Sequence, residues 1–556
     1  MKNKNALTNP IPAMKHLRFV LSIGLFACCV ALDAQTARPK LVVGIVVDQM
    51  RWDYLHRYAG RYTQQGFLRL LGEGFSADNC QINYFPTVTA AGHASVYTGT
   101  TPAVHGIVGN RFRDGNRWQY CTEDTTVCAV GSTGKAGKMS PRNLMATTIG
   151  DEMKLATNFR SKVVGVALKD RASILPAGHC ADAAYWFDAE NGCFISSTYY
   201  LQTLPAWVQA FNARHLPDSL LAGKWETLFP VETYTQSTPD PSPYEEPYVT
   251  NGTVEFPYDL GALFTQCGYD LIRRVPAGAT LTFQMAEAAV RGEQLGKGAQ
   301  TDMLCVSISS TDYIGHQFGI NAVETEDTYL RLDRDLAQFL NFLDREVGRG
   351  EYLLFLTADH GAAHNIDFNR AHGIPSEPWP MSGTTRQLAD YLKNYYQTNQ
   401  PLLFGDRDCK ICLNHDVIAR QGINEQELRQ LSLRFLENES LFAYVADISQ
   451  IATAPIPQLI RERAINGYYR TRSGELLTIP RPAVYGEDNR QNITGTMHGV
   501  WNPYDAHIPC IFFGWGINHG ATAREVHITD IAPTVCSLLH IQMPNGTTGT
   551  TINLNP

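Results

Sequence analysis

The sequence has no excess of positive charge and only one long hydrophobic run. Lysine and arginine together number 46 against 54 acidic residues, which gives a net charge of −8 at neutral pH. This balance argues against a nucleic-acid-binding surface, so an anionic ligand must be attracted by local cations. Outside residues 19–32, no apolar stretch approaches the roughly 18 residues that a membrane-spanning helix needs. The sequence therefore predicts no nucleic-acid partner and no membrane span.

Internal repeats and low-complexity segments are also absent, which argues against a repeat architecture. Among the 13 cysteines, Cys409 and Cys412 form a CxxC pair. No second pair accompanies it, so we expect a local disulfide here rather than a zinc site. Nothing in the sequence indicates an oligomeric state.

The amino-terminal segment has the pattern of an export signal. Basic residues, among them Lys15 and Arg18, precede the apolar residues 19–32, and a small-residue site follows near Ala34. This pattern predicts a signal peptide over residues 1–34 and a main domain over residues 35–556, either periplasmic or secreted. The segment also loosely resembles a lipoprotein cleavage box, which it fits poorly, so we favour export as a soluble protein.

Four apolar runs rich in β-branched residues have the pattern of strands buried on both faces of a parallel sheet. They are residues 41–47, 161–168, 303–309 and 352–357. With helical patterns over residues 280–291 and 323–347, they predict an α/β fold with a doubly wound, mostly parallel sheet flanked by helices. Residues 180–260 are aromatic and proline-rich, and we expect a cap-like insertion that shapes the mouth of the cleft. Residues 386–436 are expected to be largely helical.

Acids and histidines follow three of these strands. Asp48 follows the first, Asp312 and His316 follow the third, and Asp359 and His360 follow the fourth. Because the carboxyl ends of parallel strands share one edge of a sheet, these side chains can meet although they are far apart in sequence. Carboxylates and imidazoles are ligands that suit Zn²⁺.

One more histidine would complete two metal sites, and the sequence offers His498 and His507 before the predicted strand at residues 510–513. Three acids and three histidines suffice for two zinc ions roughly 4 Å apart, which suits in-line phosphoryl displacement. Each residue alone has a simpler explanation as a helix cap or a solvated loop charge. Their common position after strands favours a metal site.

A predicted helix over residues 90–97 begins next to Thr89. Free backbone N–H groups and the positive end of the helix dipole at such a place favour an anion, and a nucleophile that attacks one. Thr89 alone is best explained as a helix cap; beside two metals it becomes the predicted nucleophile. Lys169 and Arg171, just past the second strand, and Asn110 are predicted to bind the phosphoryl oxygens.

Together these motifs resemble the alkaline phosphatase superfamily, and most of all its secreted bacterial alkaline phosphatases with a threonine nucleophile. The matching segments run in family order over almost all of the chain after the signal. They are Asp48, residues 86–93, Asn110, and residues 169–171, 312–316, 359–361 and 498–499. The resemblance implies an alkaline phosphatase-like fold and the hydrolysis of small phosphate monoesters through a covalent phosphothreonine.

The resemblance also implies two Zn²⁺ per chain. One zinc ion would be held by Asp312, His316 and His498, and the second by Asp48, Asp359, His360 and Thr89. The family pattern places a histidine followed by glycine well before the closing strand, which favours His498 over His507. Spacing to the Gly-His pair at residues 92–93 favours Thr89 over Thr87.

Three other functions are weighed against this one. A nucleotide pyrophosphatase or phosphodiesterase would use the same metals and threonine, but the pair of Lys169 and Arg171 suits the more negative monoester. A sulfatase would need a Cys-x-Pro-x-Arg-type run near residues 80–100, where none is found. A catalytically inactive, secreted binding protein would have lost a site residue, and none is missing.

Overall fold

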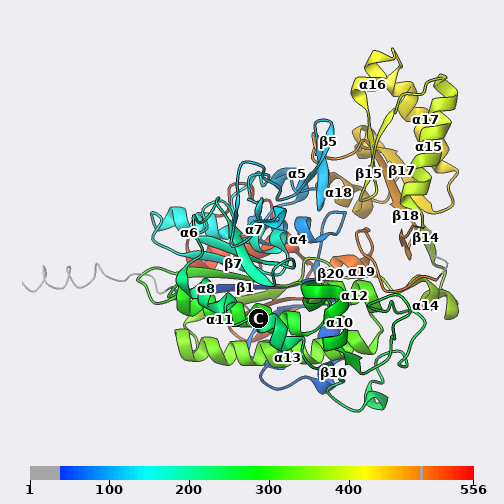
Figure 1. Ribbon diagram of the computed structural model, residues 1–556. Helices are drawn as coiled ribbons and strands as arrows, with labels where there is room; N and C mark the ends of the chain where they lie inside the picture. Colours follow the sequence, from blue (N-terminus) through cyan, green and yellow to red (C-terminus); the bar gives the residue numbers. More distant parts are fainter. Residues whose placement is uncertain (1–37, 489–491, 556) are drawn as a thin grey trace, which may run out of the picture. The chain divides into compact units, whose positions relative to one another are not determined.

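A ten-stranded sheet forms the centre of the computed structural model, which describes residues 38–488 and 492–555 (Figure 1). The strand order is β22-β2-β21-β13-β1-β12-β7-β8-β9-β6. Five neighbours are parallel: β13 (Tyr352–Thr357), β1 (Leu41–Val47), β12 (Asp302–Ile308), β7 (Val163–Ala167) and β8 (Ala183–Asp188). The four strands predicted from apolar runs are therefore confirmed, and they are adjacent in the sheet.

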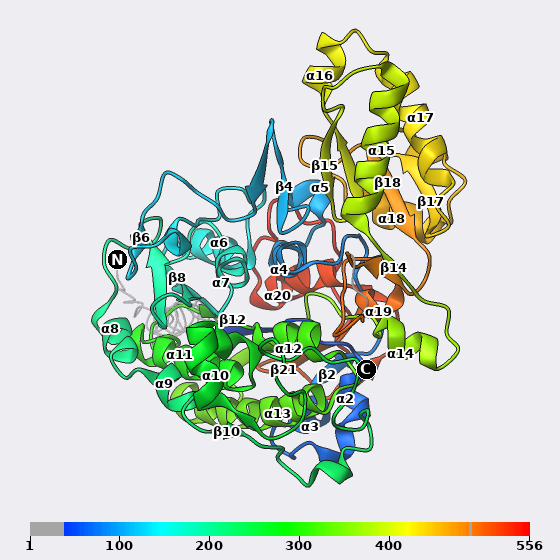
Figure 2. The same ribbon diagram turned by 45° about the vertical axis from the view of Figure 1, so that its right-hand side comes forward.

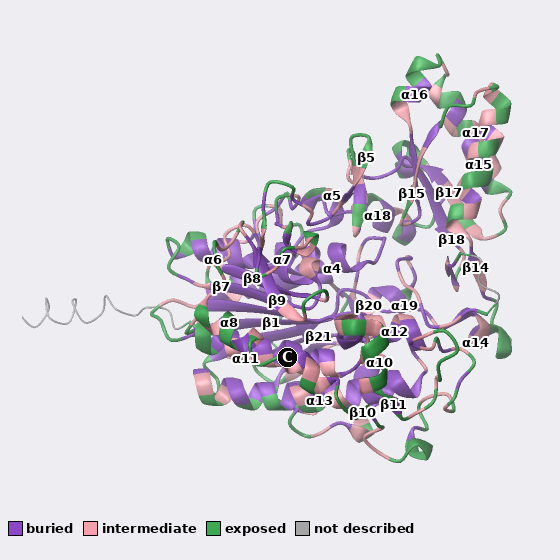
Figure 3. Ribbon diagram, viewed as in Figure 1, coloured by how far each residue is buried: buried purple, intermediate pink, exposed green. Residues whose placement is uncertain are grey.

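The parallel strands are buried on both faces, which explains their continuous apolar sequences (Figure 3). Helices α4 (Thr89–Thr98) and α7 (Asp170–Ala177) lie on one side of these strands, and α11 (Ala277–Gly292) and α13 (Val323–Leu343) on the other (Figures 1 and 2). This arrangement confirms the predicted α/β class. All candidate ligands that follow β1, β12 and β13 lie at the carboxyl edge of this parallel core.

Antiparallel strands flank the parallel ones. The strand predicted near residues 510–513 is β21 (Cys510–Gly514), which pairs with β13, and β9 (Cys193–Ser197) pairs with β8. The remaining strands are β2 (Phe75–Ala77), β22 (Gly520–Thr522) and β6 (Ala129–Val130).

The segment expected as a cap-like insertion, residues 180–260, begins inside the sheet. Strands β8 and β9 belong to this segment, so the expectation is wrong for its first part. Tyr185, Trp186 and Phe187, whose aromatic character suggested an irregular region, are buried strand residues. The remainder carries short helices α8 (Ala206–Asn212) and α9 (Leu216–Leu220) and a ribbon of β10 (Lys224–Trp225) and β11 (Tyr258–Asp259).

A second, four-stranded antiparallel sheet follows, and two of its strands, β15 (Leu403–Arg407) and β16 (Lys410–Leu413), lie within residues 386–436, which were expected to be largely helical. Its order is β15, β16, β18 (Leu476–Pro480) and β17 (Phe442–Asp447). Helices α15 (Met381–Tyr396) and α17 (Glu425–Glu437) pack beside it (Figure 2). Strand β15 is only partly buried and ends in Gly405, Asp406 and Arg407, so it lacks the continuous apolar run that marks a central strand.

Cys409 and Cys412 are free thiols, as is every other cysteine in the described ranges, so the predicted local disulfide is wrong. Cys412 lies in β16 and Cys409 just before it; three residues of extended chain span about 10 Å, beyond the reach of a disulfide. Within the same ranges, no helix combines the length and the apolar character needed to cross a membrane. The predicted signal peptide, residues 1–34, lies outside the described residues.

Candidate active site

Thr89 is the first residue of α4, and the preceding residue, Val88, occupies the N-cap position. The capping explanation for Thr89 therefore fails. The backbone N–H group of Ala90 donates to the Oδ1 atom of Asn110 at 3.0 Å. The Nδ2 amide group of Asn110 is thereby left as a donor for an anion. Thr87 has a different role, since its hydroxyl donates to the Val500 carbonyl at 2.8 Å. The Thr89 hydroxyl therefore lies at the start of α4, where the Ala90 N–H group already holds the side chain of Asn110 in position.

Asp48, Asp359 and His360 form a fully buried group beside this helix. One ligand atom from each lies within 4.8 Å of the other two. The Oδ1 atom of Asp48, the Oδ2 atom of Asp359 and the Nε2 atom of His360 have no hydrogen-bond partner among the residues that the structure describes. Buried polar atoms are otherwise nearly always paired. Three converging ligand atoms without a hydrogen-bond partner fit a bound cation.

Asp312, His316 and His498 form the adjoining group. The Nε2 atom of His316 lies 3.1 Å from the Oδ1 atom of Asp312, and the Nε2 atom of His498 lies 3.6 Å from the same oxygen. The rings of His498 and His360 stack with their centroids 3.6 Å apart, so the two groups are continuous. One ligand atom each from Asp312, His360 and His498 lies within 4.8 Å of the other two, so His360 is close to both groups.

Backbone carbonyls fix the orientation of all three histidines. The Nδ1 atoms of His316, His360 and His498 lie 2.8, 3.0 and 2.7 Å from the carbonyl oxygens of Thr496, Gly361 and Thr87. Nδ1–H bonds to a carbonyl leave Nε2 as a lone-pair donor, as is usual for histidines that bind metal. Burial lowers the pKa of His360. Burial and the neighbouring His360 and His316 lower the pKa of His498. Both shifts favour the neutral, metal-binding form of the imidazole.

His507 does not join the group. Its Nε2 atom lies 2.8 Å from the carbonyl oxygen of Asp78, and its ring stacks on Trp52. The geometry thus favours His498 as the sixth ligand.

The pKa values of Asp48 and Asp312 are shifted in opposite directions. Burial and the nearby Asp359 raise the pKa of Asp48 well above its usual value. Burial acts in the same direction on Asp312, but His316 and Lys169 outweigh it and hold the pKa of Asp312 low. Acids crowded in this way are stabilised as carboxylates only by cations in direct contact.

Lys169 is such a cation. Its Nζ atom lies 2.7 Å from Asp48 and 2.5 Å from Asp312, so its ammonium stands between one member of each group. It was expected to bind phosphoryl oxygens, and that role stays a prediction because here the ammonium neutralises two buried carboxylates. Arg171 contacts neither acid; its Nη1 atom donates to the Tyr120 hydroxyl at 3.0 Å.

Several supporting residues were not recognised in the sequence. Gln49 donates from its backbone N–H to Asp359 at 3.1 Å and from its side chain to Asp312 at 2.7 Å. Its positive φ of 66° is a strained conformation of the kind found at functional sites, and only its position after Asp48 hinted at a role. The Nδ1 atom of His93 is hydrogen-bonded to the Thr89 carbonyl and lies 3.2 Å from the Oδ2 atom of Asp359, at ion-pair distance without a hydrogen bond. Tyr120, which holds Arg171, gave no sequence signal.

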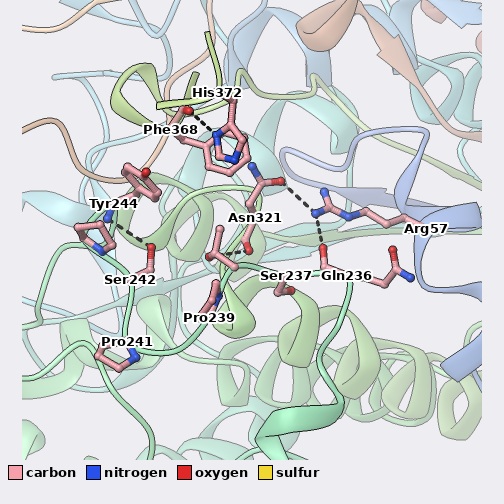
Figure 4. Close-up of a pocket in the computed structure, with 12 residues that line it drawn as sticks. Arg57, Gln236, Ser237, Pro239, Pro241, Ser242, Tyr244, Asn321, Phe368 and His372 are labelled. Carbon is pink, nitrogen blue, oxygen red and sulfur yellow. Dashed lines mark hydrogen bonds between the residues drawn. The ribbon is translucent and has the colours of Figure 1, made fainter. Parts of the chain in front are cut away.

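A cavity of about 480 Å³ adjoins His316. Tyr313 and His316 line one side of it, and Glu246 and Tyr248, from the second part of the segment expected as an insertion, line another. A separate cavity of about 510 Å³ borders Arg57 and Asn321 (Figure 4) and contains no candidate ligand.

The fold and the site define the class. An α/β sheet carries three acids and three histidines at its carboxyl edge, with oxygen and nitrogen donors that suit zinc. A threonine hydroxyl and a guanidinium lie beside them, in the first turns of α4 and α7. This is the arrangement of a two-metal hydrolase that acts on phosphoryl esters.

Comparisons with known proteins agree. The family described as "Type I phosphodiesterase / nucleotide pyrophosphatase" matches residues 42–501. The "Calcium-transporting ATPase" of Myroides odoratus is 47% identical over 95% of this chain and 96% of its own. The alkaline phosphatase PhoV of Synechococcus elongatus is 46% identical over 93% and 92%. The alkaline phosphatase PafA of Elizabethkingia meningoseptica is 47% identical over 92% and 93%.

The crystal structure of PafA superposes with a TM-score of 0.90, covering 93% of this chain and 99% of that one. A variant of PafA that has also been solved is altered at one threonine, one asparagine, one lysine and one arginine. Its threonine and asparagine have the sequence separation of Thr89 and Asn110, and its lysine and arginine that of Lys169 and Arg171. The chain belongs to the alkaline phosphatase superfamily, in the group of PafA- and PhoV-type alkaline phosphatases.

Proposed function

We propose that the protein hydrolyses small phosphate monoesters, as an alkaline phosphatase, with Thr89 as the nucleophile and two zinc ions as cofactors. The observation that carries the proposal is the convergence of unpaired, buried donor atoms from Asp48, Asp359 and His360 beside the start of α4. Two of the relatives, PhoV and PafA, are named alkaline phosphatases, which supports the same activity.

Two sets of residues would hold the metals. Asp312, His316 and His498 form one set, and Asp48, Asp359, His360 and Thr89 form the other. When bound, two zinc ions would lower the pKa of the threonine hydroxyl and neutralise charge on the leaving oxygen. Gln49 and His93 keep the two aspartates in place, and the backbone contacts at Nδ1 keep the histidines in place.

The chain's own groups carry the reaction through two displacements. Arg171 and the Nδ2 amide of Asn110 bind non-bridging oxygens of the phosphoryl group, at a helix start that favours negative charge. The Thr89 oxygen attacks phosphorus, the ester P–O bond breaks, and the alcohol leaves with a proton. Water then attacks the phosphothreonine from the opposite side, which releases inorganic phosphate and restores the Thr89 hydroxyl.

The organic group of the ester fits the cavity beside His316. This cavity is lined by Tyr313, Tyr248 and Arg274 among others, so it offers aromatic faces and one cation. The aromatic faces suit a flat organic group, whereas Glu246 and Glu487, which also line the cavity, disfavour an anionic one.

A panel of monoesters and diesters tests the proposal. We expect p-nitrophenyl phosphate to be hydrolysed at about pH 9 far faster than its bis ester, and a chelator to abolish both activities. Bound zinc without turnover would refute the enzyme and favour the inactive binding protein. Faster turnover of diesters would favour the phosphodiesterase alternative.

We also propose that the chain is exported to the periplasm or beyond after removal of residues 1–34. The support is the order of basic residues, apolar run and small-residue site in that segment. Cell fractionation and amino-terminal sequencing of the mature protein test it; full-length protein confined to the cytoplasm would contradict it.

A further inference from the structure

Three carboxylates form a second ligand cluster, built from a loop and a helix. Glu324 is the second residue of α13, and Asp240 and Glu245 lie in the segment between β10 and β11. One oxygen from each lies within 4.8 Å of the other two. Glu324 is fully buried and Glu245 is 5% exposed.

Each carboxylate has one unpaired oxygen, and in Glu324 and Asp240 the other oxygen accepts a hydrogen bond. The Tyr258 hydroxyl donates to the Oε1 atom of Glu324, and the Phe256 N–H donates to the Oδ2 atom of Asp240 at 3.1 Å. The Oδ1 atom of Asp240 and the Oε2 atoms of Glu245 and Glu324 have no partner in the part of the chain that the structure describes. Buried, unpaired carboxylate oxygens are costly unless a ligand meets them.

The neighbouring acids on α13 have cationic partners. Glu326 pairs with Arg61 at 2.7 Å, and Asp327 pairs with Arg331 at 2.6 Å. Glu324, which precedes them, has no such partner within residues 38–488 and 492–555. Within those ranges, Glu326 and Asp327 are therefore each neutralised by an arginine, whereas Glu324 in the carboxylate cluster is not.

Burial and mutual repulsion would otherwise force protons onto the cluster. Burial, Glu324 and Asp240 raise the pKa of Glu245 to about 10. Burial raises the pKa of Glu324 to about 8, although the Tyr258 hydroxyl opposes the shift. At neutral pH, either protons or a cation must therefore compensate the charge.

We propose that Asp240, Glu245 and Glu324 bind a calcium ion, at a site separate from the hydrolytic centre. All three donors are oxygens, which suits a hard cation rather than zinc. Three carboxylates from protein are also more than magnesium usually takes, since it keeps several of its waters. Asp240 is partly exposed, so water can complete the coordination.

The loop is held without the cation, so the site is formed in advance. Arg57 donates to the Gln236 carbonyl at 2.5 Å and to the Asn321 side chain at 3.0 Å (Figure 4). The Thr238 N–H donates to the Asn321 carbonyl at 2.7 Å. Preformed ligands lose little entropy when they bind an ion.

The ion would also steady one wall of the cavity beside His316. Directly after Glu245, the Glu246 N–H donates to the Gln317 carbonyl at 2.9 Å, and the Gln317 side chain donates back at 3.0 Å. Gln317 follows His316 in α12 (Ser310–Phe318). Calcium bound at the cluster would therefore stiffen the loop that meets the organic group of the substrate.

Calorimetry and thermal unfolding of the full chain test the proposal. The protein is first stripped on a chelating resin and reloaded with zinc alone, and its metal content is checked by mass spectrometry. We expect calcium chloride to bind at one ion per chain and to raise the Tm by a few degrees. Magnesium chloride should bind at least about tenfold more weakly.

Glu245→Gln and Asp240→Asn should each weaken calcium binding at least about tenfold and remove most of the Tm rise, since affinity follows the number of ligand charges. Glu232→Gln, in the same segment between β10 and β11 but exposed, is the matched control and should bind like the wild type. Binding does not depend on hydrolysis, so failure here leaves the proposed activity unaffected.

Two results would overturn the proposal. One is a wild type whose Tm and heat signal do not respond to calcium, while Glu245→Gln is at least as stable; protons would then compensate the cluster. The other is calcium binding that is equal in the wild type, Glu245→Gln and Asp240→Asn.

Discussion

Arg171→Ala tests the proposed binding of phosphoryl oxygens more cleanly than a substitution of Lys169 does. Lys169 touches Asp48 and Asp312, so its removal would alter metal binding as well. The Arg171 guanidinium contacts Tyr120, whose hydroxyl donates to Asp170 at 2.9 Å. Burial opposes its charge, but Tyr120, Tyr313 and Asp170 raise its pKa further, so it remains charged at every working pH.

The expected magnitude follows from the charge of the substrate. A hydrogen bond to a charged group contributes about 1.5–3 kcal/mol, and each 1.36 kcal/mol is a factor of ten. For a doubly charged monoester, Arg171→Ala should therefore lower kcat/KM about 10- to 150-fold. A diester carries about half the charge on its non-bridging oxygens, so Coulomb's law halves the free energy and gives about a 3- to 12-fold loss. The ratio of monoesterase to diesterase activity should fall about 3- to 12-fold.

The assay compares kcat/KM for p-nitrophenyl phosphate and its bis ester, at fixed ionic strength because salt screens the interaction. Arg160→Ala is the matched control: Arg160 is exposed and precedes β7, so it lies at the opposite end of that strand from Arg171. Arg171→Lys should recover part of the loss, since it keeps the charge but not the fork of donors. Equal losses for the two substrates would refute the role assigned to Arg171.

Three further predictions address the rest of the chain. Thr89→Ala should abolish the phosphoenzyme trapped by acid quench, whereas Thr87→Ala should retain it, because the Thr87 hydroxyl is already bonded to a backbone carbonyl; the reverse result would exchange their roles. His498→Ala should lose about one zinc ion per chain by mass spectrometry and His507→Ala none; equal zinc contents would remove His498 from the site. Burial opposes protonation of His415, but hydrogen bonds to two glutamates raise its pKa, so its stabilisation is complete below about pH 6.5 and is lost as the pH rises through the folded value. The Tm of the wild type should therefore fall relative to that of His415→Gln above this pH, and a constant difference would contradict the assignment.

The sequence predicted those parts of the fold that a local pattern encodes. Strands β1, β7, β12 and β13 are buried on both faces, so each is written as an apolar run. In the small antiparallel sheet, β15 was missed because it is half-exposed and ends in Gly405, Asp406 and Arg407. Strand β8 was missed because its aromatic residues were grouped with the proline-rich segment that follows it.

The site was predictable where a residue type is itself a ligand. Asp and His after a strand indicate metal binding, whereas Gln49 and Tyr120 act only through partners distant in sequence. Gln49 bonds to Asp359 and Asp312 across more than 250 residues. Such contacts depend on strand order, which local patterns do not specify. The carboxylate cluster around Glu324 was missed likewise, because its members come from two segments that only the fold brings together.

Gly92 explains how the proposed nucleophile and the proposed metal ligands keep a fixed relation. A glycine inside a helix costs about 1 kcal/mol relative to alanine, so its place in α4 requires a reason. A methyl group at Gly92 would collide with the main chain of Asp359. The first turn of α4 therefore rests directly on the segment that follows β13, and His93 joins the two by contacting both the Thr89 carbonyl and the Asp359 carboxylate. Because Thr89 and Asp359 share this contact, the helix that presents the hydroxyl cannot shift without moving a ligand, and the geometry needed for in-line attack is set by packing before any substrate arrives.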